Sequence, residues 1–552
     1  MVASKDKKLL EMFVADRKQL EAIQSIVSLQ QKALLNPVEF WAKNSMAGFN
    51  IMSAALGRGA VEAERGDRRF TDDVWENNPA FKALKQGFLT WRKQLSDWVD
   101  QQDLSEKDSK RAKLLLTTLA DAVAPTNTLL GNPKALKRTL ETGGTNLVAG
   151  FKNIVSDLAE NDGMPSMVDK TAFKVGENLA VTPGKVIYRE PHLELIQYTP
   201  QTKLVQTTPV FLVPPQINKF YIWDLSPERS VVEYLVQQGF QVFLVSWFNP
   251  TAEQADWGLQ SYVEALDRAS AIASEVSGSK QLHMVGACSG GITTATLLAY
   301  WKAKSTDRAR SVSLLVTVLD TQDTAETAIG LMTSLELLEL ARAASQRIGV
   351  LEGKDLKKIF AWLRPNELIW SYWVTNYLLG DKPPAFDLLY WNSDTTCLSA
   401  NLHSDFIDIL EANALTKSGA LYIGEYAIDL GAVDCDALVV GGTTDHITPW
   451  EGCYRTLDML GGETSFVLSN SGHVQALVNP PTNPKASYVL NTGNHNTPEA
   501  FLSKGEKHEG TWWEHWADWL RERSDRETKA PKSHGTTEHA PICDAPGQYV
   551  LM

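Results

Sequence analysis

The sequence predicts a doubly wound α/β fold preceded by a mainly helical domain, and three observations support this. After about residue 185, short β-rich runs alternate with helical stretches, which is typical of a mostly parallel sheet. One run leads into Gly286-Ala287-Cys288-Ser289-Gly290, a glycine-flanked turn between a strand and a helix. A long, aromatic-rich stretch then precedes the last strands. We therefore expect a sheet domain that carries a large insertion.

Residues 1–185 are predicted to form the helical N-terminal domain. Apolar residues recur at three-to-four spacing around Leu9–Phe13 and again from Phe81 to Trp91, as on one face of a helix. The sheet domain is expected over 186–524 and a C-terminal tail over 525–552. The polar composition of this tail predicts a flexible end or a surface wrap.

The predicted strands of the sheet domain are short and rich in β-branched and aromatic residues. They cover 193–198, 210–213, 241–247, 282–285, 312–319, 437–441 and 465–468. The connection over about 321–436 is far longer than an ordinary loop between neighbouring strands. It contains helix formers and many aromatic residues, so we expect a helical lid over the active site, with most tryptophans serving as its core.

Composition narrows the class of protein. The 552 residues are 43% hydrophobic and 22% charged, as expected for globular domains, and the net charge of -13 argues against a nucleic-acid partner. The five cysteines form no CxxC pair, so neither a zinc site nor a disulfide framework is expected. No apolar run reaches the ~20 residues of a spanning helix, and no secretion signal is recognised. We expect a soluble, cytoplasmic protein without a resident metal.

The glycine-flanked turn has the layout of the nucleophile elbow of α/β-hydrolases, with Cys288 in place of the usual serine. In that arrangement the acid and the histidine follow the nucleophile in chain order. Asp445 follows the strand at 437–441, and His473 follows the strand at 465–468. We therefore predict that His473 deprotonates the Cys288 thiol and that Asp445 orients the imidazole.

Two other residues compete for these roles. His446 is adjacent to Asp445 and could serve as the base, although the loop after the later strand would then lack a functional residue. Asp320 follows the strand after the elbow and could serve as the acid, since some related folds place it there. The chain order favours Asp445 and His473.

Backbone N–H groups are expected to stabilise the oxyanion of acyl transfer. The first is that of Ser289, at the start of the helix after the elbow. The second should come from the loop after the strand at 210–213, which begins with two prolines that cannot donate. Gln216 and Ile217 are the candidates, and we select Ile217.

Several longer motifs resemble those of polyhydroxyalkanoate synthases. They are Gly286–Gly291, Pro214–Ile222, Ser246–Pro250, Tyr390–Thr396 and Gly441–Trp450 in the sheet domain, Asp67–Phe70 and Trp75–Pro79 in the helical domain, and the closing Ala545–Val550. The resemblance covers most of the chain. The Ala-Cys-Ser form of the elbow and the chain length are most similar to the class II enzymes of pseudomonads, which polymerise medium-chain (R)-3-hydroxyacyl-CoA.

This resemblance implies a polyester synthase. Cys288, Asp445 and His473 fall on the family's catalytic triad and Trp391 on its characteristic tryptophan, so Trp391 and His446 are expected near the substrate or in the lid. Coenzyme A would be the leaving group rather than a cofactor. The family also implies a homodimer, contacts with phasins and a location on the surface of polyester granules.

Chain-length preference is expected to depend on side chains that line the acyl pocket, with Thr317 and Val474 as candidates. Two other functions remain open at the level of sequence. A cysteine-dependent hydrolase, such as a thioesterase or an intracellular depolymerase, would use the same triad. A granule-coat protein with a vestigial elbow would not need an intact triad, which speaks against it.

Overall fold

The computed structural model describes residues 61–64, 67–322, 330–331, 335–491 and 497–552. The predicted helical pattern at Leu9–Phe13 lies outside these residues. The chain divides into two compact units. The helical unit contains residues up to Pro165 and also the later segment Pro365–Asp381, and the sheet unit contains Ser166–Arg364 and Lys382–Met552. The three-part domain division stays a prediction.

Three of the described helices of the helical unit begin where the sequence supplies a side-chain cap. The helices are α4 (Val74–Asn77), α5 (Pro79–Asp100), α6 (Glu106–Ala122), η1 (Pro125–Asn127), α7 (Pro133–Glu141) and α8 (Thr145–Glu160). Asn78 accepts hydrogen bonds from two backbone N–H groups at the start of α5, Ser105 caps α6 and Asn132 caps α7. Phe70, Trp75, Phe88, Leu89 and Ala124 form the buried core between them.

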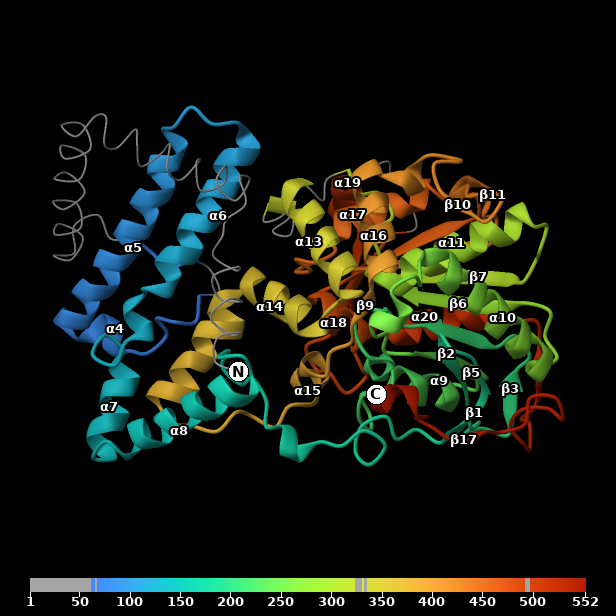
Figure 1. Ribbon diagram of the computed structural model, residues 1–552, viewed down its shortest axis with the longest axis horizontal. Helices are drawn as coiled ribbons and strands as arrows, with labels where there is room; N and C mark the ends of the chain where they lie inside the picture. The colour runs from blue at the N-terminus through green and yellow to red at the C-terminus, as the bar shows by residue number, and fades with distance from the viewer. Residues whose placement is uncertain (1–60, 65–66, 323–329, 332–334, 492–496) are drawn as a thin grey trace. The chain divides into compact units, whose positions relative to one another are not determined.

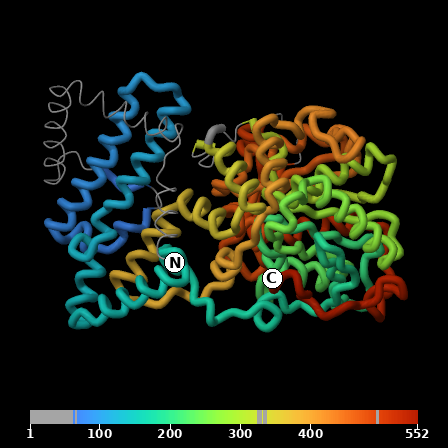
Figure 2. Tube along the Cα trace, viewed as in Figure 1, coloured from blue at the N-terminus to red at the C-terminus, as the bar shows by residue number. Residues whose placement is uncertain are grey.

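The segment Pro365–Asp381, taken from the middle of the predicted insertion, packs as part of the helical unit. It forms the π-helical stretches η6 (Asn366–Trp370) and η7 (Trp373–Leu378), and the yellow trace of this segment accompanies α8 in Figure 2. A Cβ at Gly150 of α8 would lie 1.9 Å from the Tyr377 carbonyl oxygen, so only glycine permits this approach. The Asn146 amide donates to the Leu378 carbonyl at 2.7 Å.

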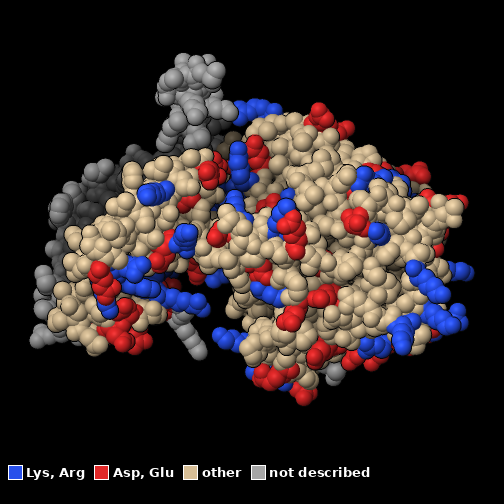
Figure 3. Space-filling model, turned by 90° about the horizontal axis from the view of Figure 1, so that it is seen from below, with Lys and Arg blue, Asp and Glu red and all other residues tan. Residues whose placement is uncertain are grey.

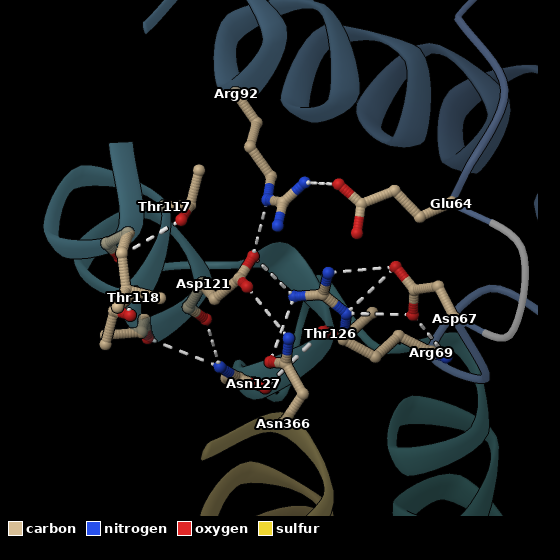
Figure 4. Close-up of polar contacts among 12 residues, drawn as sticks. Glu64, Asp67, Arg69, Arg92, Thr117, Thr118, Asp121, Thr126, Asn127 and Asn366 are labelled. Atoms are coloured by element: carbon tan, nitrogen blue, oxygen red, sulfur yellow. Dashed lines mark hydrogen bonds and ion pairs between the residues drawn. The ribbon is translucent and has the colours of Figure 1, made fainter. Parts of the chain in front are cut away.

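A polar cluster around Asp121 fixes the same segment (Figure 4). The Asp121 carboxylate accepts from Arg69 at 2.8 Å, from Arg92 at 3.1 Å and from the Asn366 amide at 2.8 Å. Arg69 also pairs with Asp67 at 2.9 Å. Charged groups removed from water need this degree of pairing, because each unpaired one would carry a large desolvation cost. The cluster therefore joins the first helices to a segment far along the chain.

An eleven-stranded sheet is the centre of the described part of the sheet unit. Its order is β15-β14-β13-β12-β7-β6-β4-β5-β2-β1-β17. The strands from β5 to β13 in this order run parallel, whereas both edges are antiparallel. The bounds are β1 (Gly184–Arg189), β2 (Leu193–Tyr198), β4 (Val210–Val213), β5 (Val242–Trp247), β6 (Leu282–Ala287), β7 (Ala309–Leu315), β12 (Asp436–Gly442), β13 (Thr464–Ser469), β14 (Ser487–Leu490), β15 (Glu506–Glu509) and β17 (Cys543–Asp544).

The predicted doubly wound sheet is confirmed, with one boundary corrected. The strand expected over 312–319 is β7, which begins at Ala309 and ends at Leu315. Val316 has a φ of 44°, a left-handed conformation that a strand cannot continue through. Thr317 therefore lies in the loop at the carboxyl end of the sheet.

Helices cover both faces of this sheet, as Figure 1 shows for the sheet unit. One buried cluster contains residues of α10 (Leu259–Ser277) and α11 (Ser289–Ala303), and the other contains α9 (Val231–Gln237) and α20 (Trp512–Glu522). Trp512, Trp513 and Trp516 are fully buried, and the Trp516 indole donates to the Ser313 hydroxyl at 2.9 Å. These tryptophans therefore pack against the sheet.

The described part of the insertion is mainly helical, in agreement with the predicted lid composition. Its elements are α13 (Leu335–Ile348), β8 (Val350–Leu351), α14 (Gly353–Leu363), η6, η7, α15 (Asp387–Ser393), β9 (Leu398–Ser399), α16 (Ala400–Ala412), η8 (Ala414–Thr416), β10 (Tyr422–Ile423), β11 (Tyr426–Ala427) and η9 (Leu430–Ala432). The remaining short elements of the sheet unit are η2 (Lys170–Ala172), β3 (Leu204–Gln206), η3 (Phe220–Ile222), η4 (Ala252–Gln254), α17 (Trp450–Arg455), η10 (Thr456–Asp458), α18 (His473–Leu477) and α19 (Pro498–Lys504).

The C-terminal residues wrap around the sheet unit rather than extending from it. β16 (Glu527–Lys529) pairs with β3, β17 pairs with the edge strand β1, and the chain closes with η11 (Tyr549–Leu551). Of the two forms expected for the tail, the surface wrap is the one observed.

Two surface properties bear on partners. Within the described residues, none of the helices combines the length and apolar character needed to cross a membrane. Basic and acidic side chains are interspersed over the face shown in Figure 3. That face is thus mixed in charge rather than uniformly basic.

Candidate active site

The elbow holds Cys288 between the end of β6 and the start of α11. Cys288 has φ 49° and ψ -123°, a strained conformation for a residue with a side chain. The flanking glycines are required by space. A Cβ at Gly286 would lie 2.6 Å from the Thr294 hydroxyl, and one at Gly290 would lie 2.5 Å from the Pro214 carbonyl oxygen. The local sequence therefore forces the thiol to the carboxyl edge of the sheet.

The structure brings His473 and Asp445 together at the same edge. Asp445 follows β12, His473 begins α18 after β13, and the His473 Nδ1 lies 2.7 Å from the Asp445 Oδ2. The Asp445 side chain is fully buried and that of His473 is 11% exposed. The other Asp445 oxygen accepts the N–H groups of Ile447 and Thr448, both at 2.9 Å. This leaves the carboxylate oriented before any substrate binds.

The electrostatics favour a charged imidazole in the resting protein. Burial alone would lower the pKa of His473, but the Asp445 carboxylate and the Cys288 sulfur outweigh it and raise this pKa to about 10. Burial likewise opposes the charge on Asp445, while His473 and Thr448 hold the pKa of this carboxyl below its ordinary value. A hydrogen bond between the His473 imidazole and the Cys288 thiol also raises the pKa of His473, so the two side chains are in contact.

The two competing residues have other surroundings. Asp320 pairs with Arg455 at 3.0 Å and accepts from the Asn413 amide at 2.8 Å. His446 is half-buried beside the acid, but the Asp445 carboxylate is bonded to His473. The geometry therefore supports Asp445 and His473 as the partners of Cys288.

The loop after β4 lies against the elbow. The Gln216 N–H donates to the Ser289 hydroxyl at 3.2 Å, and the Gln216 amide donates to the Thr293 hydroxyl at 2.9 Å. Because the Gln216 N–H is bonded in this way, Ile217 is the better candidate for the second oxyanion donor. The Ser289 N–H lies in the first turn of α11, where the helix leaves N–H groups without helical acceptors.

Comparison with known proteins identifies the family. The family model described as "Poly-beta-hydroxybutyrate polymerase (PhaC) N-terminus" matches residues 66–235, and the "alpha/beta hydrolase fold" model matches residues 209–480. Poly(3-hydroxyalkanoate) polymerase 1 of Ectopseudomonas oleovorans is 44% identical, over 96% of this chain and 94% of the relative. The chain belongs to this polymerase family.

Two further relatives refine the assignment. Poly(3-hydroxyalkanoate) polymerase 2 of Ectopseudomonas oleovorans is 42% identical over 96% of this chain and 94% of its own length. The polymerase subunit of Cupriavidus necator is 36% identical over 92% of this chain and 87% of its own length. The higher identity to the two pseudomonad polymerases agrees with the class II resemblance, and the α/β-hydrolase fold predicted from the elbow is confirmed.

Trp391, the tryptophan singled out by the family motif, contacts the loop after β4. Its side chain is buried, and its indole N–H donates to the Lys219 carbonyl at 2.7 Å. The nearby Thr396 hydroxyl donates to the Gln216 carbonyl at 3.1 Å. Trp391 thus holds the loop that carries Ile217, the candidate for the second oxyanion donor.

Thr448 is a site residue that the sequence analysis missed. Its hydroxyl lies 2.7 Å from the Asp445 Oδ2 and 3.0 Å from the His473 Nδ1. Thr448 therefore contacts both the acid and the base of the candidate triad. The signal in the sequence is weak, since an aspartate in a turn commonly accepts the backbone N–H two residues on, and Thr448 lies one residue beyond that position.

The role of Thr317 and Val474 in lining an acyl pocket stays a prediction. The Thr317 hydroxyl donates to the Leu315 carbonyl at 2.9 Å, and a Cβ on Gly291 would collide with Thr317. Val474 is partly buried against the core beside His473. Within the described residues, Glu275 of α10 and Glu538 and His539 of the C-terminal wrap could bring ligand atoms within 4.8 Å of one another, but both glutamates are exposed and no role in acyl transfer follows.

Proposed function

We propose that this chain polymerises medium-chain (R)-3-hydroxyacyl-CoA into a polyester, with Cys288 as the nucleophile, His473 as the proton carrier and Asp445 as its orienting acid. One observation carries the proposal. The thiol, the imidazole and the carboxylate come together at the carboxyl ends of β6, β13 and β12, in a chain that belongs to the polymerase family. Coenzyme A is the leaving group, and the chemistry needs no resident cofactor.

Acylation begins with the Cys288 sulfur beside the charged imidazole of His473. The raised pKa of His473 keeps its proton at neutral pH, and this cation stabilises negative charge on the Cys288 sulfur. The thiolate attacks the thioester carbonyl of the substrate, and the Ser289 and Ile217 N–H groups stabilise the oxyanion. His473 then donates its proton to the departing coenzyme A sulfur.

Elongation requires the opposite direction of proton transfer. Once Cys288 carries an acyl group, its sulfur no longer bears charge, so one of the causes that raise the pKa of His473 is removed. The neutral imidazole can then accept the proton of a 3-hydroxyl group as that oxygen attacks the acyl carbon. An ester bond forms, the carbon–sulfur bond breaks and the thiolate is restored.

A cysteine suits this chemistry better than a serine. Exchange of one thioester for another conserves the activation of the acyl group, whereas an ester to serine would lose much of it. Water must be kept from the thioester between additions. We propose that the helical insertion around Trp391 provides this exclusion.

We also propose a cytoplasmic location on the surface of polyester granules, with homodimer and phasin contacts as the family resemblance implies. Helix α8 supports attachment to an apolar surface. Val148, Phe151, Val155 and Leu158 recur at helical spacing along it, and each is between 50% and 66% exposed.

The test is a turnover assay with product analysis. Purified protein given (R)-3-hydroxyoctanoyl-CoA should release free coenzyme A and yield insoluble polyester, measured by thiol titration and by methanolysis of the precipitate. The short-chain substrate (R)-3-hydroxybutyryl-CoA should react more slowly. Cys288→Ala should remain folded and release no coenzyme A.

The products distinguish the alternatives. Free 3-hydroxy acid in place of polymer would show a thioesterase or depolymerase. Coenzyme A release by Cys288→Ala at the wild-type rate would remove Cys288 from the nucleophile role.

A further inference from the structure

The loop Pro214–Lys219 carries the candidate oxyanion donor Ile217, yet it contains neither helix nor strand. An oxyanion donor must be held in place before the reaction, because reorganisation during the step would remove its benefit. Contacts on both flanks supply this rigidity. The Pro214 carbonyl accepts the Trp247 indole N–H at 2.9 Å, and the far end of the loop is fixed through Lys219.

Lys219 makes contacts to two distant parts of the sheet unit. Its ammonium lies 3.0 Å from the Asp394 carboxylate, which belongs to the insertion, and donates to the Val550 carbonyl at 2.8 Å. The Lys219 side chain is only 9% exposed. A cation this buried is confined to positions where both partners remain in reach, because lysine otherwise keeps its charge in water.

The partners of Lys219 are themselves fixed. The Tyr221 hydroxyl donates to Asp394 at 2.9 Å, and that carboxylate and burial both raise the pKa of Tyr221. On the other side, the buried Glu194 accepts the N–H groups of Gln548 at 2.9 Å and Tyr549 at 3.0 Å. Glu194 also pairs with Arg189 at 2.6 Å. The Val550 carbonyl is therefore presented by a C-terminal segment anchored on β1 and β2.

The position of Lys219 governs the position of the oxyanion donor. Ile217 precedes Lys219 by two residues, so their backbones are joined by at most about 7 Å of chain. The Lys219 carbonyl is also held by Trp391. A shift of the Lys219 backbone would therefore move the Ile217 N–H relative to the Cys288 acyl group.

We propose that Lys219 is a positioning residue for acyl transfer: its ion pair with Asp394 and its bond to the C-terminal Val550 carbonyl hold the Ile217 N–H in the oxyanion-binding position. This inference rests on the proposed acyl-transfer function. It assigns a role in the active site to the C-terminal segment, which lies far from the triad in sequence.

The experiment compares two reactions of Cys288 in the same full-length variants. Alkylation by iodoacetamide consumes the thiolate without forming an oxyanion. Acylation by p-nitrophenyl butyrate proceeds through an oxyanion but requires neither coenzyme A nor polymerisation. The variants are Lys219→Met, Asp394→Asn and their combination, with Arg308→Met as the matched control. Arg308 pairs with Asp267 at 2.7 Å in the same unit and does not touch the loop.

Lys219→Met should slow acylation about 10- to 100-fold, part of the loss known for deletion of an oxyanion donor, and leave alkylation within about twofold. The KM for hydroxyacyl-CoA should change little while kcat falls. Asp394→Asn should show the same pattern, and the double variant should lose less than the product of the two single losses. Arg308→Met should lower the melting temperature but leave the ratio of the acylation rate to the alkylation rate unchanged.

Three results would overturn the inference: unchanged acylation in Lys219→Met, an equal loss of alkylation and acylation, or full additivity of the two substitutions. Failure of the proposed function is seen separately. It would appear as wild-type protein that is acylated by the ester but forms no polymer from hydroxyacyl-CoA.

Discussion

Asp121 of the helical unit and Asp445 of the sheet unit are both buried carboxylates, with side chains 5% and 0% exposed, yet they serve different ends. Asp121 is surrounded by Arg69, Arg92 and Asn366 (Figure 4). Asp445 is bonded to an imidazole, a hydroxyl and backbone N–H groups. The partners differ in one property, since a guanidinium never gives up its proton and an imidazole can.

This difference separates a structural network from a reactive one. Burial opposes the charge on Arg69, but Asp67 and Asp121 outweigh it and raise the pKa of Arg69 further above its ordinary value. We call the cluster around Asp121 a closed network, because the guanidinium groups that surround the carboxylate keep their protons. The pKa of His473 is also raised by the Cys288 sulfur, so the imidazole interacts with this thiol as well as with Asp445. A buried carboxylate therefore indicates function only through the kind of cation that it holds.

The largest effect should follow from replacing Asp445, the carboxylate that is bonded to His473. Asp445→Asn replaces an acceptor with an amide that can donate to the His473 Nδ1, which favours the wrong tautomer and removes the main cause of its raised pKa. We expect kcat for coenzyme A release to fall by about 10³-fold, in the range seen when a triad aspartate is changed. Initial rates measure this, and circular dichroism checks the fold. A loss of less than tenfold would contradict the orienting role.

Replacing Asp121, the carboxylate shared by Arg69 and Arg92, should instead affect stability. Asp121→Asn leaves Arg69 and Arg92 without their shared carboxylate, which should lower the free energy of unfolding by about 3 kcal/mol. Urea denaturation measures this change. The rate of coenzyme A release per folded molecule should stay within about twofold.

A surface pair on the neighbouring helix provides the control for Asp121. Lys93 and Asp97 are both about half exposed on α5, so Lys93→Gln should change stability by at most about 0.5 kcal/mol. If Lys93→Gln and Asp121→Asn cost the same, the closed network around Asp121 adds nothing to stability.

The two networks should also differ in pH dependence. The folded-state pKa of His473, about 10, lies above its ordinary value of 6.5. Its charge therefore contributes stability that is fully present below pH 6.5 and is lost as pH rises to about 10. The difference in melting temperature between wild type and His473→Gln should shrink across this range. The difference between wild type and Arg69→Met should stay constant, because Arg69 remains charged throughout.

If the difference in melting temperature between wild type and His473→Gln stayed the same from pH 6.5 to 10, His473 would not carry the extra proton. If the difference in melting temperature between wild type and Arg69→Met varied by the same amount, the two networks would not differ in whether they release a proton.

Much of the reactive network follows from local sequence. The glycines of the elbow exclude side chains at Gly286 and Gly290, so the strand–turn–helix form and the exposure of Cys288 are dictated within a few residues. The strands before Asp445 and His473 are short apolar runs that periodicity detects. Because parallel strands end at one edge, chain order then predicts that the side chains meet.

The closed network could not be predicted in the same way. Nothing near Asn366 indicates that Pro365–Asp381 packs with the first helices, because the complementary groups lie on Arg69 and Asp121, which are 297 and 245 residues earlier. The docking of the C-terminal residues on β1 also depends on distant partners, since the polar tail has no strand periodicity of its own.

The sequence by itself determined the elbow around Cys288, the chain order of Cys288, Asp445 and His473, and the family, because these depend on short-range sterics and on motifs that are contiguous in the chain. The tertiary structure alone decided three contacts. The Gln216 N–H donates to the Ser289 hydroxyl, and the Thr448 hydroxyl lies within hydrogen-bond distance of both Asp445 and His473. Lys219 connects the loop after β4 to Asp394 and Val550. The physical reason is that hydrogen bonds and ion pairs are short and directional. Whether two distant residues satisfy them is settled only when the fold sets their separation to a few ångströms.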